Sequence, residues 1–189
     1  MKVREWEKLQ FIDPTRALVG LRNFASTEAF SDLPYEVASL RKRELRQFEE
    51  SRQCALFCQG LSQVTGRKVT YAQSERADYD FIARFPKDGV LHYAPIQMKE
   101  LVPEEVNPYA NLQDELKKLA KYTDSQDLVV AVHVNRVTTI HLSQLILPQA
   151  TIGALWFFGA NDQTQNTWTI VGNLTRPGSR SCEFQYPQG

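Results

Sequence analysis

The sequence predicts an α/β protein built around a mixed β-sheet. The first indication is the order of its patterns: a helix, three β-rich runs, an amphipathic helix, a strand, and then two more strands. The second is the run at residues 127–134, DLVVAVHV, whose near-continuous apolar character is typical of a strand covered on both faces. The third is Pro86-Lys87-Asp88-Gly89 between two apolar runs, which predicts a β-hairpin.

Residues 1–44 are expected to form an irregular helical extension that precedes the main domain. A clearer helix is expected to begin near Ser31-Asp32-Leu33-Pro34, where Ser31 or Asp32 can cap the first turn and proline fits it. We expect this helix to continue to Gly60, with a break near residue 50.

The main α/β domain is expected to span residues 45–175. After Gly66 the pattern changes to alternating β-rich runs separated by turn signals. Residues 176–189 contain proline and glycine and are expected to form a loosely ordered tail. The expected elements are strands near 69–71, 79–85, 90–98, 127–134, 152–158 and 167–171, an amphipathic helix at 111–122, and a short helix at 142–147.

Composition excludes several classes of protein. Of the 189 residues 42% are apolar, which is enough for a core, and no apolar run approaches the roughly 20 residues that span a bilayer. The charged start lacks a secretory signal, and three cysteines do not suggest a disulfide framework, so a cytoplasmic protein is expected, without a membrane partner. Lys and Arg number 22, as do Asp and Glu, so any nucleic-acid surface must be a local basic face.

Three polar residues stand out in the second and third expected strands. Ile96 and Met98 alternate with Gln97 and Lys99, so the latter pair shares the opposite strand face. Asp80 lies on the neighbouring strand and is expected to lie beside them. A carboxylate and an amide carbonyl are hard oxygen ligands that suit Mg²⁺ or Mn²⁺, and a lysine beside them can orient a water or stabilise phosphate charge. These are the components of a metal-assisted phosphodiester hydrolysis site.

On these residues the sequence resembles the PD-(D/E)xK nuclease superfamily. The segments DYDFIA and PIQMKEL, with Asp80 followed by Gln97-Met98-Lys99, most resemble the QxK branch found in type IV restriction enzyme catalytic domains. The resemblance covers about residues 45–135. It implies a restriction-endonuclease-like α-β-β-β-α-β core, here with an N-terminal helical extension and two extra C-terminal strands.

The resemblance also implies an activity and the residues that perform it. It implies a Mg²⁺- or Mn²⁺-dependent nuclease acting on nucleic acid, DNA being the expected form, with Asp80, Gln97 and Glu49 holding the metal and Lys99 positioning the attacking water. Glu49 is chosen because Phe48-Glu49 matches an "FE" pair of that branch. Glu50 and Glu44 are alternatives to Glu49, and Asp78 is the alternative to Asp80. The residues expected to contact nucleic acid are Lys117, Lys121 and Arg43.

Other interpretations remain open at this point. Gln97 and Lys99 can instead be the solvent face of an edge strand, and the lysines of 111–122 a solvated helix face paired with Asp114 and Glu115. The fold can also serve, without catalysis, as a binding or interaction module. In that case the aromatic strands at 152–171 are a candidate surface for a partner or a homodimer. A third alternative is an unrelated α/β protein in which the motif is coincidental.

Overall fold

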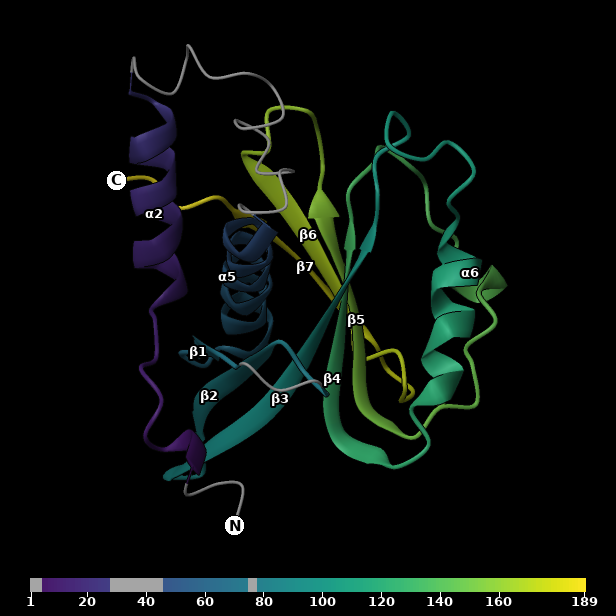
Figure 1. Cartoon of the computed structure of the whole chain (residues 1–189), viewed down its shortest axis with the longest axis horizontal. Helices are drawn as coiled ribbons and strands as arrows, with labels where there is room; N and C mark the ends of the chain where they lie inside the picture. The colour runs from purple at the N-terminus through teal and green to yellow at the C-terminus, as the bar shows by residue number, and fades with distance from the viewer. Residues whose placement is uncertain (1–4, 28–45, 75–77) are drawn as a thin grey trace.

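The computed structural model describes residues 5–27, 46–74 and 78–189. The helix start expected at 31–34 therefore lies outside the described residues, as do Arg43 and Glu44. A β-sheet lies between helices: α5 covers one face with α2 beyond it, and α6 lies against the other face (Figure 1). The helical elements are α2 (Pro14–Ala25), α5 (Arg46–Thr65), α6 (Leu112–Lys117), and the 3-10 turns η2 (Lys118–Lys121) and η3 (Leu142–Gln144). The strands are β1 (Thr70–Gln73), β2 (Phe81–Lys87), β3 (Val90–Leu101), β4 (Ser125–Val134), β5 (Ile152–Ala160), β6 (Thr167–Gly172) and β7 (Arg180–Gln185).

The sheet is mixed and its strands lie in chain order. In the described part of the chain, seven strands follow the order β1-β2-β3-β4-β5-β6-β7. β4 runs parallel to β3 and to β5, whereas the outer pairs on both sides are antiparallel. The α/β class predicted from the sequence is confirmed. So is the order helix, three strands, helix, strand, which α5, β1, β2, β3, α6 and β4 follow.

The predicted hairpin joins β2 to β3. Lys87 pairs with Val90, so only Asp88 and Gly89 form the loop, and their φ angles are 52° and 75°. Positive φ at both loop residues matches the twist of the flanking strands, and glycine adopts it without steric cost. The turn sets the register that aligns β2 with the first part of β3.

Two apolar clusters form the core, one on each face of the sheet. The cluster between the sheet and α5, here the α5-side core, includes Phe57 and Ile96. The cluster beneath α6, here the α6-side core, includes Leu116 and Val132. Because β4 contributes buried residues to both clusters, its uninterrupted apolar sequence is explained by cover on both faces.

Helix α5 extends beyond its expected C-terminal end. It is continuous through residue 50 and passes Gly60 to end at Thr65, where Gly66 turns the chain with φ of 65°. Gly60 lies against the sheet: a Cβ there would come within 2.8 Å of Phe184 and 3.2 Å of Ile170. The glycine therefore marks a close helix–sheet approach, and the expectation that it ends the helix was wrong.

The expectation of a loosely ordered tail was also wrong. Residues Arg180–Gln185 form β7, the third strand beyond β4, where two extra strands had been expected. Phe184 and Tyr186 are buried in the α5-side core, and the Tyr186 hydroxyl donates to the Leu18 carbonyl oxygen at 3.0 Å. Pro177 and Gly178 lie in the loop before β7, and Pro187 and Gly189 follow it, so these residues flank the strand and do not interrupt it.

The aromatic run of β5 is interior. Trp156, Phe157, Phe158 and Trp168 are each at most 9% exposed within the chain, so the suggestion that they form a partner surface was wrong. β5 and β6 have helices or loops on both sides, and their aromatic side chains fill the two cores. None of the helices in the described ranges is long and apolar enough to cross a membrane.

Candidate metal and phosphate site

Asp80 and Gln97 contact each other directly. The Gln97 Nε2 donates to Asp80 Oδ2 at 2.5 Å, and the Met98 backbone N–H donates to the same oxygen at 2.7 Å. The Asp80 backbone is fixed as well, because its N–H donates to the Ile96 carbonyl and its carbonyl accepts from the Ser74 N–H, both at 2.9 Å. The carboxylate therefore occupies a defined position at the start of β2, beside the middle of β3.

Lys99 lies on the same face of β3 as Gln97. Ile96 and Met98 belong to the α5-side core, and the alternation continues to Leu101, which is buried in the α6-side core. β3 is paired with β2 on one side and β4 on the other, so the edge-strand interpretation was wrong. Gln97 and Lys99 are half-buried at the border of the α6-side core.

The charges around Lys99 are mixed. Burial lowers the pKa of the Lys99 amine below its ordinary value, and the nearby ammonium of Lys121 lowers it further. The carboxylates of Asp80 and Glu115 oppose that shift, and Lys118 adds a smaller decrease. The Lys99 amine thus lies within electrostatic range of two carboxylates and two lysines.

Tyr122 is a site residue that the sequence analysis missed. Its hydroxyl donates to Gln97 Oε1 at 3.4 Å, so the amide of Gln97 is held at both ends, by Tyr122 and by Asp80. Burial raises the pKa of the Tyr122 phenol, and the Asp80 carboxylate raises it further. The available signal was its position at the end of the amphipathic helix pattern, which returns the chain to the sheet.

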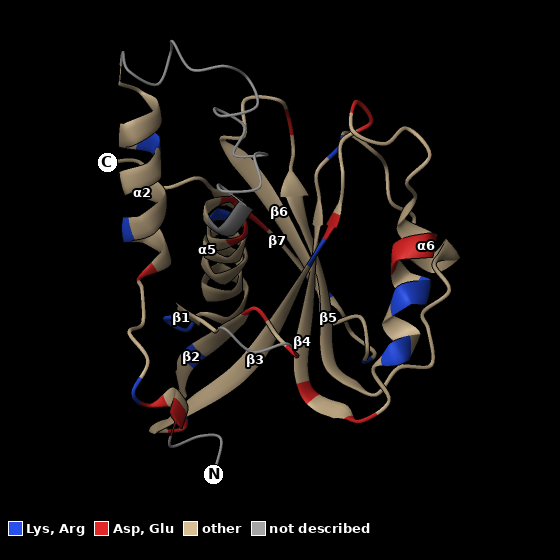
Figure 2. Ribbon diagram, in the orientation of Figure 1, with Lys and Arg blue, Asp and Glu red and all other residues tan. Residues whose placement is uncertain are grey.

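The lysines that follow Asn111 differ in their partners. Lys117 Nζ lies 2.8 Å from Asp114, and Lys118 Nζ lies 2.6 Å from Glu115, both at the i,i+3 spacing. The Lys121 Nζ lies 5.0 Å from the ring centroid of the tyrosine that follows it and, among the described residues, pairs with no carboxylate. Figure 2 shows both blue and red segments of the ribbon along α6, whereas the neighbouring strands are mostly tan. The solvated-pair interpretation therefore suits Lys117, and Lys121 is the better candidate for an anion contact.

The connection from β3 to α6 has a fixed path. Arg136 donates to the carbonyl oxygens of Val102, Asn107 and Ala110, so one guanidinium holds three points of that loop. The Asn111 side chain then caps α6 by accepting from the Asp114 N–H at 2.9 Å. These contacts fix where the helix begins, and so where its lysines lie relative to β3.

The remaining predicted residues lie on other elements or outside the described ranges. Glu49 is half-buried in the first turn of α5, the helix on the opposite face of the sheet from Gln97. Glu50 follows it and is also half-buried. Asp78 is exposed and precedes β2, so it is Asp80 that contacts Gln97. Arg43 and Glu44 are not among the described residues.

The oxygen donors define what kind of ion the site can hold. No three His, Cys, Asp or Glu side chains of the described ranges gather into a metal-binding group, so an all-protein cage does not fit. Mg²⁺ is commonly bound by one or two carboxylates and keeps several waters or substrate phosphates as its other ligands. The Asp80 carboxylate and the Gln97 amide oxygen supply the small number of protein ligands that such a Mg²⁺ ion takes.

Comparisons with protein-family models, with curated proteins and with solved structures found no match to this chain.

Proposed function

We propose that this chain is a divalent-metal-dependent nuclease that hydrolyses phosphodiester bonds, with Asp80, Gln97 and Lys99 as its central residues and DNA as the expected substrate. The observation that carries the proposal is the direct contact between Asp80 and Gln97, with Lys99 on the same face of β3. The order of α5, β1, β2, β3, α6 and β4 supports a restriction-endonuclease-like core around these residues.

Asp80 and Gln97 are the proposed ligands of one Mg²⁺ or Mn²⁺ ion. At present the Gln97 amide presents its nitrogen to Asp80 and its oxygen to Tyr122. A half-turn of that amide exchanges the two atoms, because its oxygen and nitrogen ends have nearly the same shape. A bound divalent ion would supply Lewis-acid stabilisation of phosphate charge and activation of a water. Glu49 remains the proposed additional carboxylate.

Lys99 and Lys121 are proposed to act on water and phosphate. The Lys99 amine interacts electrostatically with Asp80, and we assign it the role of hydrogen-bonding the water that attacks the phosphorus. Lys121 is free of a carboxylate partner within the described ranges and interacts electrostatically with Lys99, which suits it to a neighbouring backbone phosphate. Lys117, which is paired with Asp114, provides the matched control.

The experiment compares wild type with Lys99→Met, Asp80→Asn and Lys117→Met on plasmid DNA, single-stranded DNA and RNA in Mg²⁺ or Mn²⁺. Removing a group that handles the attacking water typically costs about 10²-fold or more in rate. We therefore expect Lys99→Met and Asp80→Asn to lose at least that much and EDTA to abolish cleavage. Lys117→Met should stay within about twofold of wild type, because an exposed ion pair contributes little.

A second candidate function is a binding module that uses the same fold without catalysis. It is favoured by the hydrogen bonds that Asp80 accepts from Gln97 and Met98, because these satisfy one carboxylate oxygen without an ion. Absence of cleavage on all three substrates, together with no Mn²⁺ binding by calorimetry, would reject the nuclease and favour this candidate. Cleavage that persists in Lys99→Met would also contradict the proposed site.

A further inference from the structure

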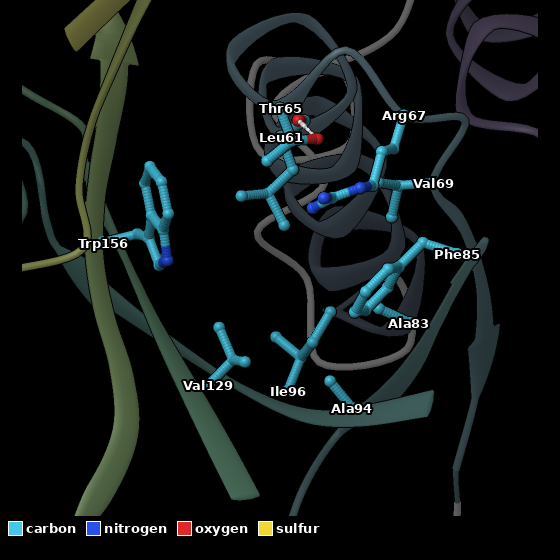
Figure 3. Close-up of a pocket in the computed structure, with 10 residues that line it drawn as sticks. All are labelled: Leu61, Thr65, Arg67, Val69, Ala83, Phe85, Ala94, Ile96, Val129 and Trp156. Carbon is cyan, nitrogen blue, oxygen red and sulfur yellow. Dashed lines mark hydrogen bonds between the residues drawn. The ribbon is translucent and has the colours of Figure 1, made fainter. Parts of the chain in front are cut away.

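A pocket lies on the face of the sheet opposite Gln97 and Lys99, beyond the last turn of α5. This pocket has a volume of about 170 Å³. Its floor is formed by strands β2 to β5, and its wall by the end of α5 and the residues that follow it (Figure 3). The lining residues are Leu61, Thr65, Arg67, Val69, Ala83, Phe85, Ala94, Ile96, Val129 and Trp156. Most are aliphatic or aromatic, so the pocket suits an apolar group of a ligand.

The charged residue of the lining has no partner within the described part of the chain. Arg67 follows Gly66, where α5 ends, and Figure 3 shows its guanidinium extending toward the space between Leu61 and Val69. Among the described residues it makes no ion pair and no hydrogen bond. Its neighbour Lys68, by contrast, lies 3.0 Å from Asp13. No acidic side chain lines the pocket, so the guanidinium charge faces it uncompensated.

A second donor without an acceptor borders the same space. Trp156 is only 9% exposed, and its indole N–H has no hydrogen-bond acceptor within the described ranges. The other two indole groups do have acceptors: Trp6 donates to the Tyr79 hydroxyl and Trp168 to the Gln165 carbonyl. The Trp156 N–H is therefore available to donate to solvent or to a molecule that occupies the pocket. Figure 3 shows the Trp156 ring on the side of the pocket opposite Arg67.

These features define the chemistry of an occupant. An apolar cavity of roughly 150 Å³ accommodates a molecule the size of benzene, so the volume here corresponds to about one aromatic ring. A guanidinium binds carboxylates through strong, charge-assisted hydrogen bonds, whereas a neutral molecule does not offer the guanidinium an opposite charge. The Trp156 indole N–H can donate to an acceptor at the other end of the same molecule.

We propose that this pocket binds a small aromatic carboxylate, with its ring against Leu61, Ile96 and Val129, its carboxylate on Arg67 and an acceptor group facing the Trp156 N–H. The site is on the face of the sheet opposite Gln97 and Lys99 and is independent of nuclease activity. Thr65 does not compete as a donor, because its hydroxyl already donates to the Leu61 carbonyl.

The test uses benzoate and 4-hydroxybenzoate as probes, with benzyl alcohol as the uncharged control and acetate as the control without a ring. Binding is followed by the indole ¹⁵N–¹H NMR signal of Trp156, identified among the three tryptophans with Trp156→Phe. We expect both aromatic carboxylates to shift that signal at millimolar concentration, with 4-hydroxybenzoate binding several-fold more tightly. Arg67→Met, which keeps the apolar stem, should lower the affinity for benzoate about tenfold or more.

Three outcomes would overturn the proposal. One is an unchanged Trp156 signal at millimolar benzoate and 4-hydroxybenzoate. Another is equal binding of benzyl alcohol and benzoate, which would make the pocket an apolar cavity without selectivity for an anion. The third is wild-type affinity for benzoate in Arg67→Met. If Trp156→Phe fails to fold, Ala94→Leu provides the second variant: it fills the pocket and should abolish the response, and a persisting response would place the ligand elsewhere.

Discussion

The two faces of the sheet are covered to different extents, and their functional candidates lie where each cover ends. On one face α5 runs for 20 residues, and an apolar pocket lies beyond its last turn. On the other, α6 has 6 residues and continues as a 3-10 turn and loops, which leaves Gln97 and Lys99 half-buried. The adjacent β3 residues Ile96 and Gln97 lie on these two different faces of the sheet. The chemistry of each candidate site thus follows from which strand face it uses.

The largest expected effect tests whether both faces support one cooperative core. Leu56 on α5 and Leu116 on α6 are both fully buried, one in each core. Truncating either to alanine leaves a cavity, so each variant should lose about 3 kcal/mol of unfolding free energy. Urea unfolding followed by circular dichroism measures this loss. A loss confined to one variant would show that the two faces unfold separately.

Leu61 is the matched control within α5, because it is partly buried at the edge of the pocket. A side chain that already borders open space loses fewer contacts on truncation, and Leu61→Ala should cost about 1 kcal/mol. If Leu61→Ala costs as much as Leu56→Ala, the pocket is filled or closed in solution and the contrast between the two ends of α5 is lost.

Alanine substitutions at two helix glycines should change the stability by smaller amounts and in opposite directions. Gly60→Ala puts a Cβ 2.8 Å from the buried Phe184 ring and 3.2 Å from the Ile170 Cβ, and neither atom is the end of a flexible chain. Overpacking of about 1–3 kcal/mol should outweigh the roughly 1 kcal/mol that alanine contributes to a helix. Gly20 in α2 has no neighbour within 4 Å of that position, so Gly20→Ala should stabilise by about 1 kcal/mol. Thermal unfolding of both variants tests this; a stabilised Gly60→Ala would mean that α5 sits less tightly on the sheet.

The smallest expected effect on stability appears at alkaline pH and is absent at neutral pH. Burial raises the pKa of Tyr71 in the α5-side core to about 12, although its hydrogen bond with Ser51 opposes the shift. The unfolded chain ionises this phenol first, near its ordinary value of 10.0, so the fold is destabilised progressively as pH rises from there toward 12. Tyr71→Phe should remove this part of the alkaline loss and leave the rest. An unchanged pH dependence of unfolding between wild type and Tyr71→Phe would show that the phenol is accessible to solvent.

Local patterns in the sequence predicted most of the strands. The alternation around Gln97, the apolar run of β4 and the Lys-Asp-Gly turn each reflect short-range physics, and all three gave the right element. The contact between Asp80 and Gln97 followed from hairpin geometry in the same way. These features depend on neighbours in one strand pair, which a sequence shows directly.

The errors share a different cause, because each depends on contacts between distant segments. Gly60 gives a helix-ending signal until the approach of Phe184 and Ile170 is known. Tyr122 gains its role through Gln97, and Arg67 through a pocket assembled from four strands and a helix end. Nothing local distinguishes these residues from ordinary ones.

The strand order has a consequence for how the chain acquires its structure. Every strand pairs with the one before it in sequence, so the sheet can grow by adding each new strand to an edge that already exists. The antiparallel pairs close through short connections, whereas the parallel pairs β3–β4 and β4–β5 need the longer connections that run from Leu101 to Ser125 and from Val134 to Ile152. The long-range closure comes at the end, when Tyr186 reaches Leu18 across 168 residues and β7 packs its Phe184 ring against α5. Until that step, the surface of α5 next to Gly60 lacks its aromatic partner, so an emerging chain keeps an apolar face uncovered until its last strand arrives.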